Sequence, residues 1–591
     1  MFKSKPSIVA TAVLLSLGLS ACGGSSDKKE VEVVNTAPTA VALSANTIVE
    51  NDVAVEVGTL TATDADTADT HTYAVNDDRF EVTSTGVLKL AAEQFINFEQ
   101  EPTIALTVTV TDSASNSFEQ ELTLDVTDSI GVQSVIDGLT IPTTYAFDSK
   151  VDTGSSVSYS GQTARQVLLV QLTNYIGGGL ADEVEAGTIT SGAEAKAALM
   201  LRYASTEEQW DLDADDALEI TTTPGVKQAS LREISSSHKN LQGKIAGNDG
   251  ADSTQHKDWE TELVGWNAKG SITPNGLVEA LFDALAANVQ THLDGATRED
   301  ITGAQITKFY IQEDGTDLKQ LIQKFILGAV NFSQGADDYL DHATAGKGLL
   351  SANLEGDKSG TKAYTSLEHQ FDEGFGYFGA ARNYNDYTDL EIRAKDGRDG
   401  WNKGYNDIDA DGAIDLKAEF NFGNSTNAAK RDLGATVATD FTKQAFDAFL
   451  TGRAIINSAV TRELTTDEME TLKEQRDIAV LTWEKAISAT VVHYINDTII
   501  DLELLGTANY SADNFADLAK HWSELKGFSL NLQFNPSSPL KAADFATIQE
   551  KIGMKPVLTA GEVAAYKAEL LEARAILEAA YSFNAENVTN W

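Results

Sequence analysis

The sequence has one cysteine and few basic residues. The first shortage excludes intrachain disulfides, and the second argues against nucleic-acid binding. Because Cys22 is the only cysteine, intrachain disulfides are excluded, and stability must come from packed cores and bound ions. The 44 lysines and arginines stand against 89 aspartates and glutamates, which leaves a formal net charge of −45. A surface of that sign repels nucleic acid and favours cations, so nucleic acid is excluded as a partner.

Several catalytic signatures are also missing. The zincin pattern His-Glu-x-x-His does not occur, and the Gly177-Gly178-Gly179 triplet lacks the Lys-Ser/Thr pair of a phosphate-binding loop. No Ser/His/Asp or Cys/His arrangement can be named. The sequence leaves open whether the protein is an enzyme and favours a non-enzymatic role, with a metallopeptidase as the minority alternative.

Residues 1–22 resemble the signal of a bacterial lipoprotein. Lys3 and Lys5 precede an apolar run at 8–19, which is too short to span a bilayer, and the segment ends Leu-Ser-Ala-Cys. The resemblance implies cleavage before Cys22, lipidation of Cys22 and, with Gly23 following, an outer-membrane lipoprotein at the periplasmic face or cell surface. Residues 23–34 are polar and predict a flexible tether, and no later segment could cross a bilayer.

A period of two marks residues 35–128. Residues 57–63, 104–111 and 122–127 alternate apolar with threonine-rich positions, and Asn, Asp, Ser and Gly separate them. Short alternating strands at this spacing predict an antiparallel β-sandwich of about a hundred residues.

The acidic residues of this segment resemble those of a bacterial cadherin repeat. They follow Asn-Thr-Ala-Pro at 35–38 and fall in the cadherin order, as Ile-Val-Glu-Asn, Asp-Ala-Asp, Asn-Phe-Glu and Val-Thr-Asp. The resemblance implies weak calcium ligands at Glu50, Asp64, Asp66, Glu99 and Asp112. Asn97 stands where an acid is usual and residues 125–129 lack the usual exit linker, so a plain immunoglobulin-like spacer stays open as the alternative.

A period of 3.6 dominates residues 138–591 and predicts a large all-α helical-bundle domain. The expected helices are 164–175, 193–203, 277–293, 318–332, 428–455, 467–504, 512–525 and 564–581. The whole chain is therefore expected to be multidomain, with a small all-β cadherin- or immunoglobulin-like sandwich before an all-α domain.

Three stretches of this domain, 159–165, 238–247 and 521–528, resemble an uncharacterised family of bacterial lipoprotein domains that is similar to the imelysins. The resemblance implies a metal-binding His-x-x-Glu motif, for which residues 368–379 are the nearest match. Asp372 replaces the motif's glutamate, and Glu373 follows one residue later. His369 and Glu373 stand at i, i+4, as do Glu368 and Asp372, so on a helix each pair shares a face and could hold one cation. Histidine with carboxylates suits zinc or iron better than calcium. Phe371, Phe375 and Phe378 form a separate stripe; if it faces the core, His369 points elsewhere, so a surface His–Glu pair is the alternative.

Residues 407–419 resemble an EF-hand calcium loop. Asp407, Asp409 and Asp411 occupy positions one, three and five, and Gly412 at position six permits the turn that brings the Ala413 carbonyl to the ion. Asp415 fits position nine and Ile414 is the apolar anchor. Position twelve is Ala418, and the expected glutamate comes one residue late as Glu419. A solvated acidic turn is the alternative, and residues 211–219 repeat the pattern without the glycine.

These patterns favour a calcium-binding surface lipoprotein that acts as an adhesion or binding module, held to the membrane by its lipid and contacting a protein or cell-surface partner. The alternative is an imelysin-like protein that binds iron or zinc for metal uptake.

Overall fold

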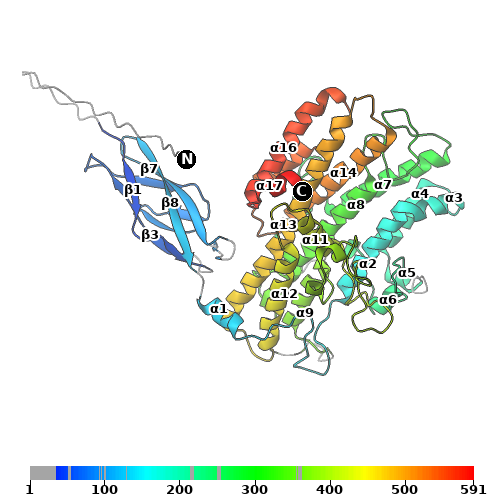
Figure 1. Ribbon diagram of the computed structural model, residues 1–591, viewed down its shortest axis with the longest axis horizontal. Helices are drawn as coiled ribbons and strands as arrows, with labels where there is room; N and C mark the ends of the chain where they lie inside the picture. The colour runs from blue at the N-terminus through cyan, green and yellow to red at the C-terminus, as the bar shows by residue number, and fades with distance from the viewer. Residues whose placement is uncertain are drawn as a thin grey trace, which may run out of the picture. The chain divides into compact units, whose positions relative to one another are not determined.

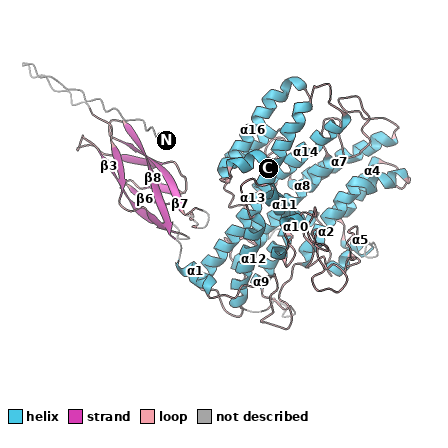
Figure 2. Cartoon of the chain, viewed as in Figure 1, coloured by secondary structure: helices cyan, strands magenta, loops and turns pink. Residues whose placement is uncertain are grey.

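The computed structural model describes residues 35–50, 55–91, 94, 96, 98, 101–127, 130–212, 218–248, 255–354, 356 and 362–591. These residues fold as two compact units that divide after Thr127 (Figure 1). Among the described residues, helices fill the second unit and all strands lie in the first (Figure 2). None of the helices described is both long and apolar enough to cross a membrane.

The first unit is a β-sandwich of two four-stranded sheets. One sheet has the order β1-β3-β6-β5 and the other β2-β8-β7-β4. All pairs are antiparallel except β2 with β8, where Ile48 lies opposite Val126 in a parallel register. The strands are β1 Ala40–Leu43, β2 Thr47–Val49, β3 Glu56–Thr63, β4 Thr72–Val75, β5 Phe80–Val82, β6 Val87–Leu90, β7 Thr103–Thr111 and β8 Ser117–Thr127.

The alternation in the sequence decides which side chains enter the sandwich core. In β7, Ile104, Leu106, Val108 and Val110 are buried, whereas the threonines between them lie at or near the surface. Successive side chains of a strand point to opposite faces, so the period of two becomes one apolar and one wet face. The predicted all-β sandwich is confirmed.

The second unit is all-α in its regular elements. Its helices are α1 Ile130–Asp137, α2 Ser160–Asn174, α3 Leu180–Glu185, α4 Gly192–Ala204, α5 Glu207–Leu212, α6 Leu231–Ile234, α7 Pro274–Leu293, α8 Leu318–Ile326, α9 Ser366–Phe378, α10 Asp389–Ile392, α11 Gly423–Gly434, α12 Phe441–Ser458, α13 Thr466–Leu504, α14 Ala512–Ser529, α15 Ala542–Ile552, α16 Val563–Ala580 and α17 Ala585–Asn590. The predicted helical domain is confirmed as a fold class.

The 39-residue helix α13 is the longest and packs against both α12 and α14. It begins at a capping box, in which the Thr465 side chain accepts from the Glu468 amide and the Glu468 side chain accepts from the Thr465 amide. Trp483, Ile487 and Val491 along its length have no exposed surface. A helix buried on most sides carries the core of the domain.

The structure differs from the expected helices at several places. The expected helix 428–455 is split into α11 and α12, because Gly434 ends the first and Asp440 caps the second by accepting from the Lys443 amide. The segment 318–332 leaves α-helical geometry after Ile326 and continues as π-helical turns to Tyr339. Helix α1 forms outside the expected helices, and its Val135 packs on the domain core.

Candidate functional site

The acidic loop 407–419 is closed at its base by two aromatic residues. Tyr405 and Phe420 form an antiparallel bridge, and their rings stack with centroids 5.6 Å apart. Within the loop Ala410 and Gly412 have φ values of 56° and 89°. Glycine adopts this left-handed region without a steric penalty, so Gly412 makes the turn that an EF-hand loop requires at its sixth position.

Asp407, Asp409 and Asp411 converge in this loop. Each offers a carboxylate oxygen, and the three oxygens lie within 4.8 Å of one another. Asp407 accepts from the amides of Asp411 and Gly412 at 3.1 and 3.0 Å, and Asp411 accepts from the Ala413 amide at 3.0 Å. The loop backbone therefore holds three like charges together at the places where an EF-hand presents its first ligands.

Glu419 is nearly fully buried, and its carboxylate lies against the backbone of the loop. Its Oε1 accepts from the Ile408 amide at 2.8 Å, and its Oε2 accepts from the Asp415 amide at 2.7 Å. Burial raises the pKa of Glu419, although these amide hydrogen bonds oppose the rise. The late glutamate thus fastens the two limbs of the loop to each other.

The loop is anchored to the segment 225–228. Ile414 is fully buried and forms a parallel bridge with Val226, donating from its amide to the Gly225 carbonyl at 2.8 Å. The Gln228 side chain binds the residues that leave the loop, 415–418, which we call the exit limb. It donates to the Asp415 carboxylate at 2.8 Å and accepts from the Leu416 amide at 3.0 Å. Pairing through the apolar eighth position fixes the loop on the domain.

A lysine from the same segment lies over the acidic cluster. The Lys227 ammonium is 2.5 Å from Asp411 and 3.7 Å from Asp409. Its hydrogen bond lowers the pKa of Asp411, and the pKa of Lys227 is raised in return. The ammonium therefore occupies part of the space that a cation bound by these aspartates would need.

The predicted cadherin-like ligands lie in two groups. Asp64 and Asp66 converge with Asp69 within 4.8 Å, and the His71 imidazole lies 3.0 Å from Asp64. Asp112 is buried beside this group, because Asn116 donates both to Asp112 and to Asn35, and Asn35 donates to Asp69. Glu50 is buried apart from them and accepts from the Phe98 amide at 2.9 Å. Glu99 lies outside the described residues, as do Cys22, the predicted tether and residues 213–217 of the second acidic stretch.

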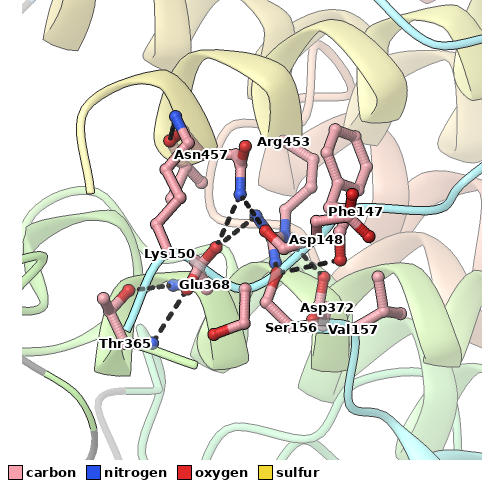
Figure 3. Close-up of polar contacts among 12 residues, drawn as sticks. Phe147, Asp148, Lys150, Ser156, Val157, Thr365, Glu368, Asp372, Arg453 and Asn457 are labelled. Carbon is pink, nitrogen blue, oxygen red and sulfur yellow. Dashed lines mark hydrogen bonds and ion pairs between the residues drawn. The ribbon is translucent and has the colours of Figure 1, made fainter. Parts of the chain in front are cut away.

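The i, i+4 pair Glu368 and Asp372 on α9 does hold a cation, and that cation is Arg453 of α12 (Figure 3). The guanidinium donates to Glu368 at 2.9 Å and to Asp372 at 2.8 Å, and all three side chains are fully buried. Asp372 also accepts from the Tyr145 hydroxyl and the Ser158 amide. Burial raises the pKa of Asp372 against the opposing effect of Arg453.

His369 and Glu373 lie on another face of α9. The His369 Nδ1 is 2.9 Å from the Ser158 carbonyl, and its Nε2 is 3.7 Å from Glu373, which accepts from Gln162 at 2.8 Å. Phe371, Phe375 and Phe378 are buried, as expected if their stripe faces the core. Because Asp372 is paired with Arg453 inside the domain, the three residues proposed from the sequence do not face one common point.

Residues 142–573 match the family described as Domain of unknown function (DUF4856). The match covers more than half of the chain. The chain belongs to this family. Its function is unknown, so membership assigns neither a metal nor a reaction, and no curated protein matches the chain. The expected similarity to the imelysins stays a prediction.

The β-sandwich is weakly similar to cadherin structures. One crystal structure of human protocadherin-24 EC1-2 is 28% identical with a TM-score of 0.14, over 16% of this chain and 46% of that chain. A second is 24% identical with a TM-score of 0.15, over 21% of this chain and 66% of that chain. The chain thus spans about half to two thirds of these chains. Such scores carry no functional argument.

The DUF4856 domain also contains a histidine and aspartate cluster that the sequence analysis missed. Asp497 of α13 has a carboxylate oxygen 3.3 Å from His493 Nε2 and 3.9 Å from His521 Nε2, and His521 belongs to α14. Asp501 accepts from His521 Nδ1 at 2.8 Å. Two sequence patterns could have indicated this cluster. His493 and Asp497 stand at i, i+4, and His521 with Glu524 forms a His-x-x-Glu pattern.

The two histidines differ in their protonation. Burial, and then the nearby Arg431 charge, lowers the pKa of His493 to about 3, so it is neutral at pH 7. Burial also opposes the charging of His521, but the hydrogen bond to Asp501 and the negative charges of Asp501 and Asp497 together outweigh it and raise the pKa of His521. A neutral imidazole, an oriented imidazole and a carboxylate therefore meet between α13 and α14.

We expect Arg453→Met to destabilise the DUF4856 domain by about 3–5 kcal/mol, because it leaves Glu368 and Asp372 buried without their cation. The exposed pair Arg462–Glu468 is the control, since Arg462→Met should cost no more than about 1 kcal/mol. Urea denaturation followed by circular dichroism measures both.

The same variant should have a steeper pH dependence. Burial already raises the pKa of Asp372, and loss of the guanidinium raises it further above its value in the unfolded chain, so the charged carboxylate opposes folding more strongly. The variant should regain stability as the pH falls and the carboxyl group protonates. Equal effects of the two substitutions would contradict a structural role for the buried pair.

Proposed function

We propose that this protein is a calcium-binding, lipid-anchored surface protein that acts as an adhesion or binding module. The observation that carries the proposal is the convergence of Asp407, Asp409 and Asp411 in a loop with EF-hand spacing. Calcium takes six to eight oxygen ligands, and a cluster of three carboxylates with a nearby backbone carbonyl supplies part of that shell. Asp415 and the Ala413 carbonyl would complete the protein's share of it.

The proposed site is a structural brace of modest affinity. Ala418 offers no carboxylate at position twelve, and Glu419 accepts from loop amides on both limbs. Affinity follows the number and charge of the ligands, so a site without the bidentate glutamate should be weak. Such a site suits a compartment outside the cytoplasm, where calcium can be plentiful.

The anchoring part of the proposal rests on the sequence. The lipoprotein-like segment ending at Cys22 supports attachment to the outer membrane, and the β-sandwich would act as a spacer between lipid and helical domain. The excess of acidic residues supports cations and a protein or cell-surface partner rather than nucleic acid. The cadherin-like acids, with Asp64 and Asp66 converging, would form a second and weaker calcium site.

We expect calcium to raise the melting temperature of the helical unit, because an ion bound only by the folded loop stabilises it. At free calcium about a hundredfold above the dissociation constant, the gain should be about 2.7 kcal/mol. The double variant Asp407→Asn, Asp409→Asn should remove this gain. Differential scanning calorimetry with calcium and with EGTA provides the measurement.

A matched control separates the two acidic clusters. Asp64→Asn with Asp66→Asn changes the sandwich only, and should leave the calcium response of the helical unit intact. A melting curve of the helical unit that is the same in calcium and EGTA would refute the proposed brace.

Removing Lys227 should strengthen calcium binding. Its ammonium contacts the carboxylates that calcium would bridge, so the ion must displace it, and Lys227→Met should raise the calcium affinity severalfold. The effect should shrink at high ionic strength, because both groups are exposed and screened. Lys443→Met is the control, since it breaks an exposed ion pair with Asp447 elsewhere. Weaker binding by Lys227→Met in calcium titrations would contradict this competition.

A second candidate function is binding of zinc or iron for metal uptake. The observation that favours it is the meeting of His493, Asp497 and His521 between two helices. Two imidazoles and one carboxylate form a ligand set for these metals, with room for water or another ligand. The ligand atoms of this cluster are not all within 4.8 Å of one another, unlike those of Asp64, Asp66 and Asp69 or of Asp407, Asp409 and Asp411. A bound metal would therefore require the side chains to move closer together.

The metal proposal predicts a site that depends on two helices. His493→Asn and His521→Asn should each abolish tight zinc binding, whereas His292→Asn on α7 should leave it unchanged. Binding should fall as the pH is lowered, because a protonated imidazole cannot ligate a metal. Competition with a chromophoric zinc chelator measures all three variants. Zinc binding that survives both substitutions would exclude this cluster as the site.

A further inference from the structure

A cavity of about 280 Å³ opens beside the start of α2 in the helical unit. It lies next to the acidic loop, because three of its lining residues come from the exit limb of that loop. The cavity is lined by Val157, Ser158, Tyr159, Ser160, Arg382, Asp415, Lys417 and Ala418. Most of these residues are polar, so the cavity suits a polar ligand.

Two cations line the cavity without a carboxylate in ion-pair contact, although Asp372 and Asp415 lie near enough to interact with the Arg382 charge. Arg382 donates from Nε to the Tyr159 hydroxyl at 3.1 Å, and its guanidinium lies 5.4 Å from the centre of that ring. Across the described ranges, neither Arg382 nor Lys417 forms an ion pair with a carboxylate.

The position of Arg382 is fixed by its backbone. Its amide donates to the Ala418 carbonyl at 2.7 Å, and its carbonyl accepts from the Tyr145 amide at 2.7 Å. The contact with Tyr159 restrains the side chain and uses only Nε. The remaining amino groups of the guanidinium form the planar fork that suits two oxygens of a carboxylate or phosphate.

The neighbouring groups add to this preference for an anion. Helix α2 begins at Ser160, and the Tyr159 side chain forms no cap hydrogen bond there. A 15-residue helix brings positive potential to its first turn, and Ser158 and Ser160 are also among the lining residues.

The one acidic lining residue is already occupied by neutral donors. Asp415 accepts from the Gln228 side chain at 2.8 Å and from the Lys417 amide at 2.9 Å. Its second oxygen can accept from a hydroxyl or ammonium group. The ligand should therefore combine an oxyanion with a small polar donor.

We propose that this cavity binds a small ligand bearing a carboxylate or phosphate group, held by Arg382 and Lys417. The volume is near the lower end for ligand pockets, so the ligand has the size of a small metabolite rather than a polymer. This site goes beyond the proposed calcium brace and does not require an ion in the loop.

The test is isothermal titration of the whole protein with succinate and with inorganic phosphate, at constant ionic strength and in EGTA. We expect saturable binding of at least one probe, with a carboxylate ligand indicated by succinate and a phosphate ligand by phosphate. Lys417→Gln and Arg382→Gln should each weaken that binding at least about tenfold, as expected for loss of a charge-assisted hydrogen bond. Lys417→Arg should retain most of it, and Lys395→Gln, an exposed lysine outside the cavity, should have no effect.

Because Lys417 is only partly buried, its substitution carries the test even if an Arg382 variant fails to fold. No saturable binding of either probe would overturn the proposal, and so would binding that is equal in wild type, Lys417→Gln and Lys395→Gln. Since the titrations are done in EGTA, failure of the calcium proposal would not change their outcome.

Discussion

The buried ion pairs of Arg453 determine where several other parts of the helical unit lie. A charge without exposed surface is costly unless it is paired and hydrogen-bonded, and Arg453 meets that condition with Glu368, Asp372 and the Ser156 hydroxyl. Asp372 also fixes the Ser158 amide and the Tyr145 hydroxyl. One interaction thus joins α9, α12 and the chain that leads into α2.

The consequences extend to the proposed sites. Tyr145 donates from its amide to the Arg382 carbonyl, and Arg382 donates to the carbonyl of Ala418 in the exit limb of the acidic loop. Ser158, held by Asp372, forms one wall of the cavity, and Arg382 forms another. The acidic loop and the cavity are therefore supported from the same buried ion pairs, the cavity directly through Ser158 and the loop through Tyr145 and Arg382.

Sequence periodicity predicted the fold class because apolar positions repeat along each element and burial follows them. It also predicted that Glu368 and Asp372 share a face and could hold a cation, which depends only on helix geometry. The identity of that cation could not be predicted, because Arg453 is 85 residues from Glu368 in the chain and the pairing depends on how α9 and α12 pack. The same limit hid the cluster of His493 and His521, since α13 and α14 bring together residues that no local pattern connects.

The surroundings of positions 418 and 419 explain why the glutamate of the acidic loop is Glu419 and not residue 418, the twelfth position of an EF-hand loop. Ala418 lines the cavity and gives its carbonyl to the Arg382 amide, so a carboxylate there would lie beside Arg382 and Lys417. At position 419 the carboxylate instead lies under the loop and accepts from its amides. A glutamate one residue earlier would tend to neutralise the cations of the cavity. With the glutamate at position 419, the negative charge lies toward the acidic loop, and the positive charges of Arg382 and Lys417 remain toward the cavity.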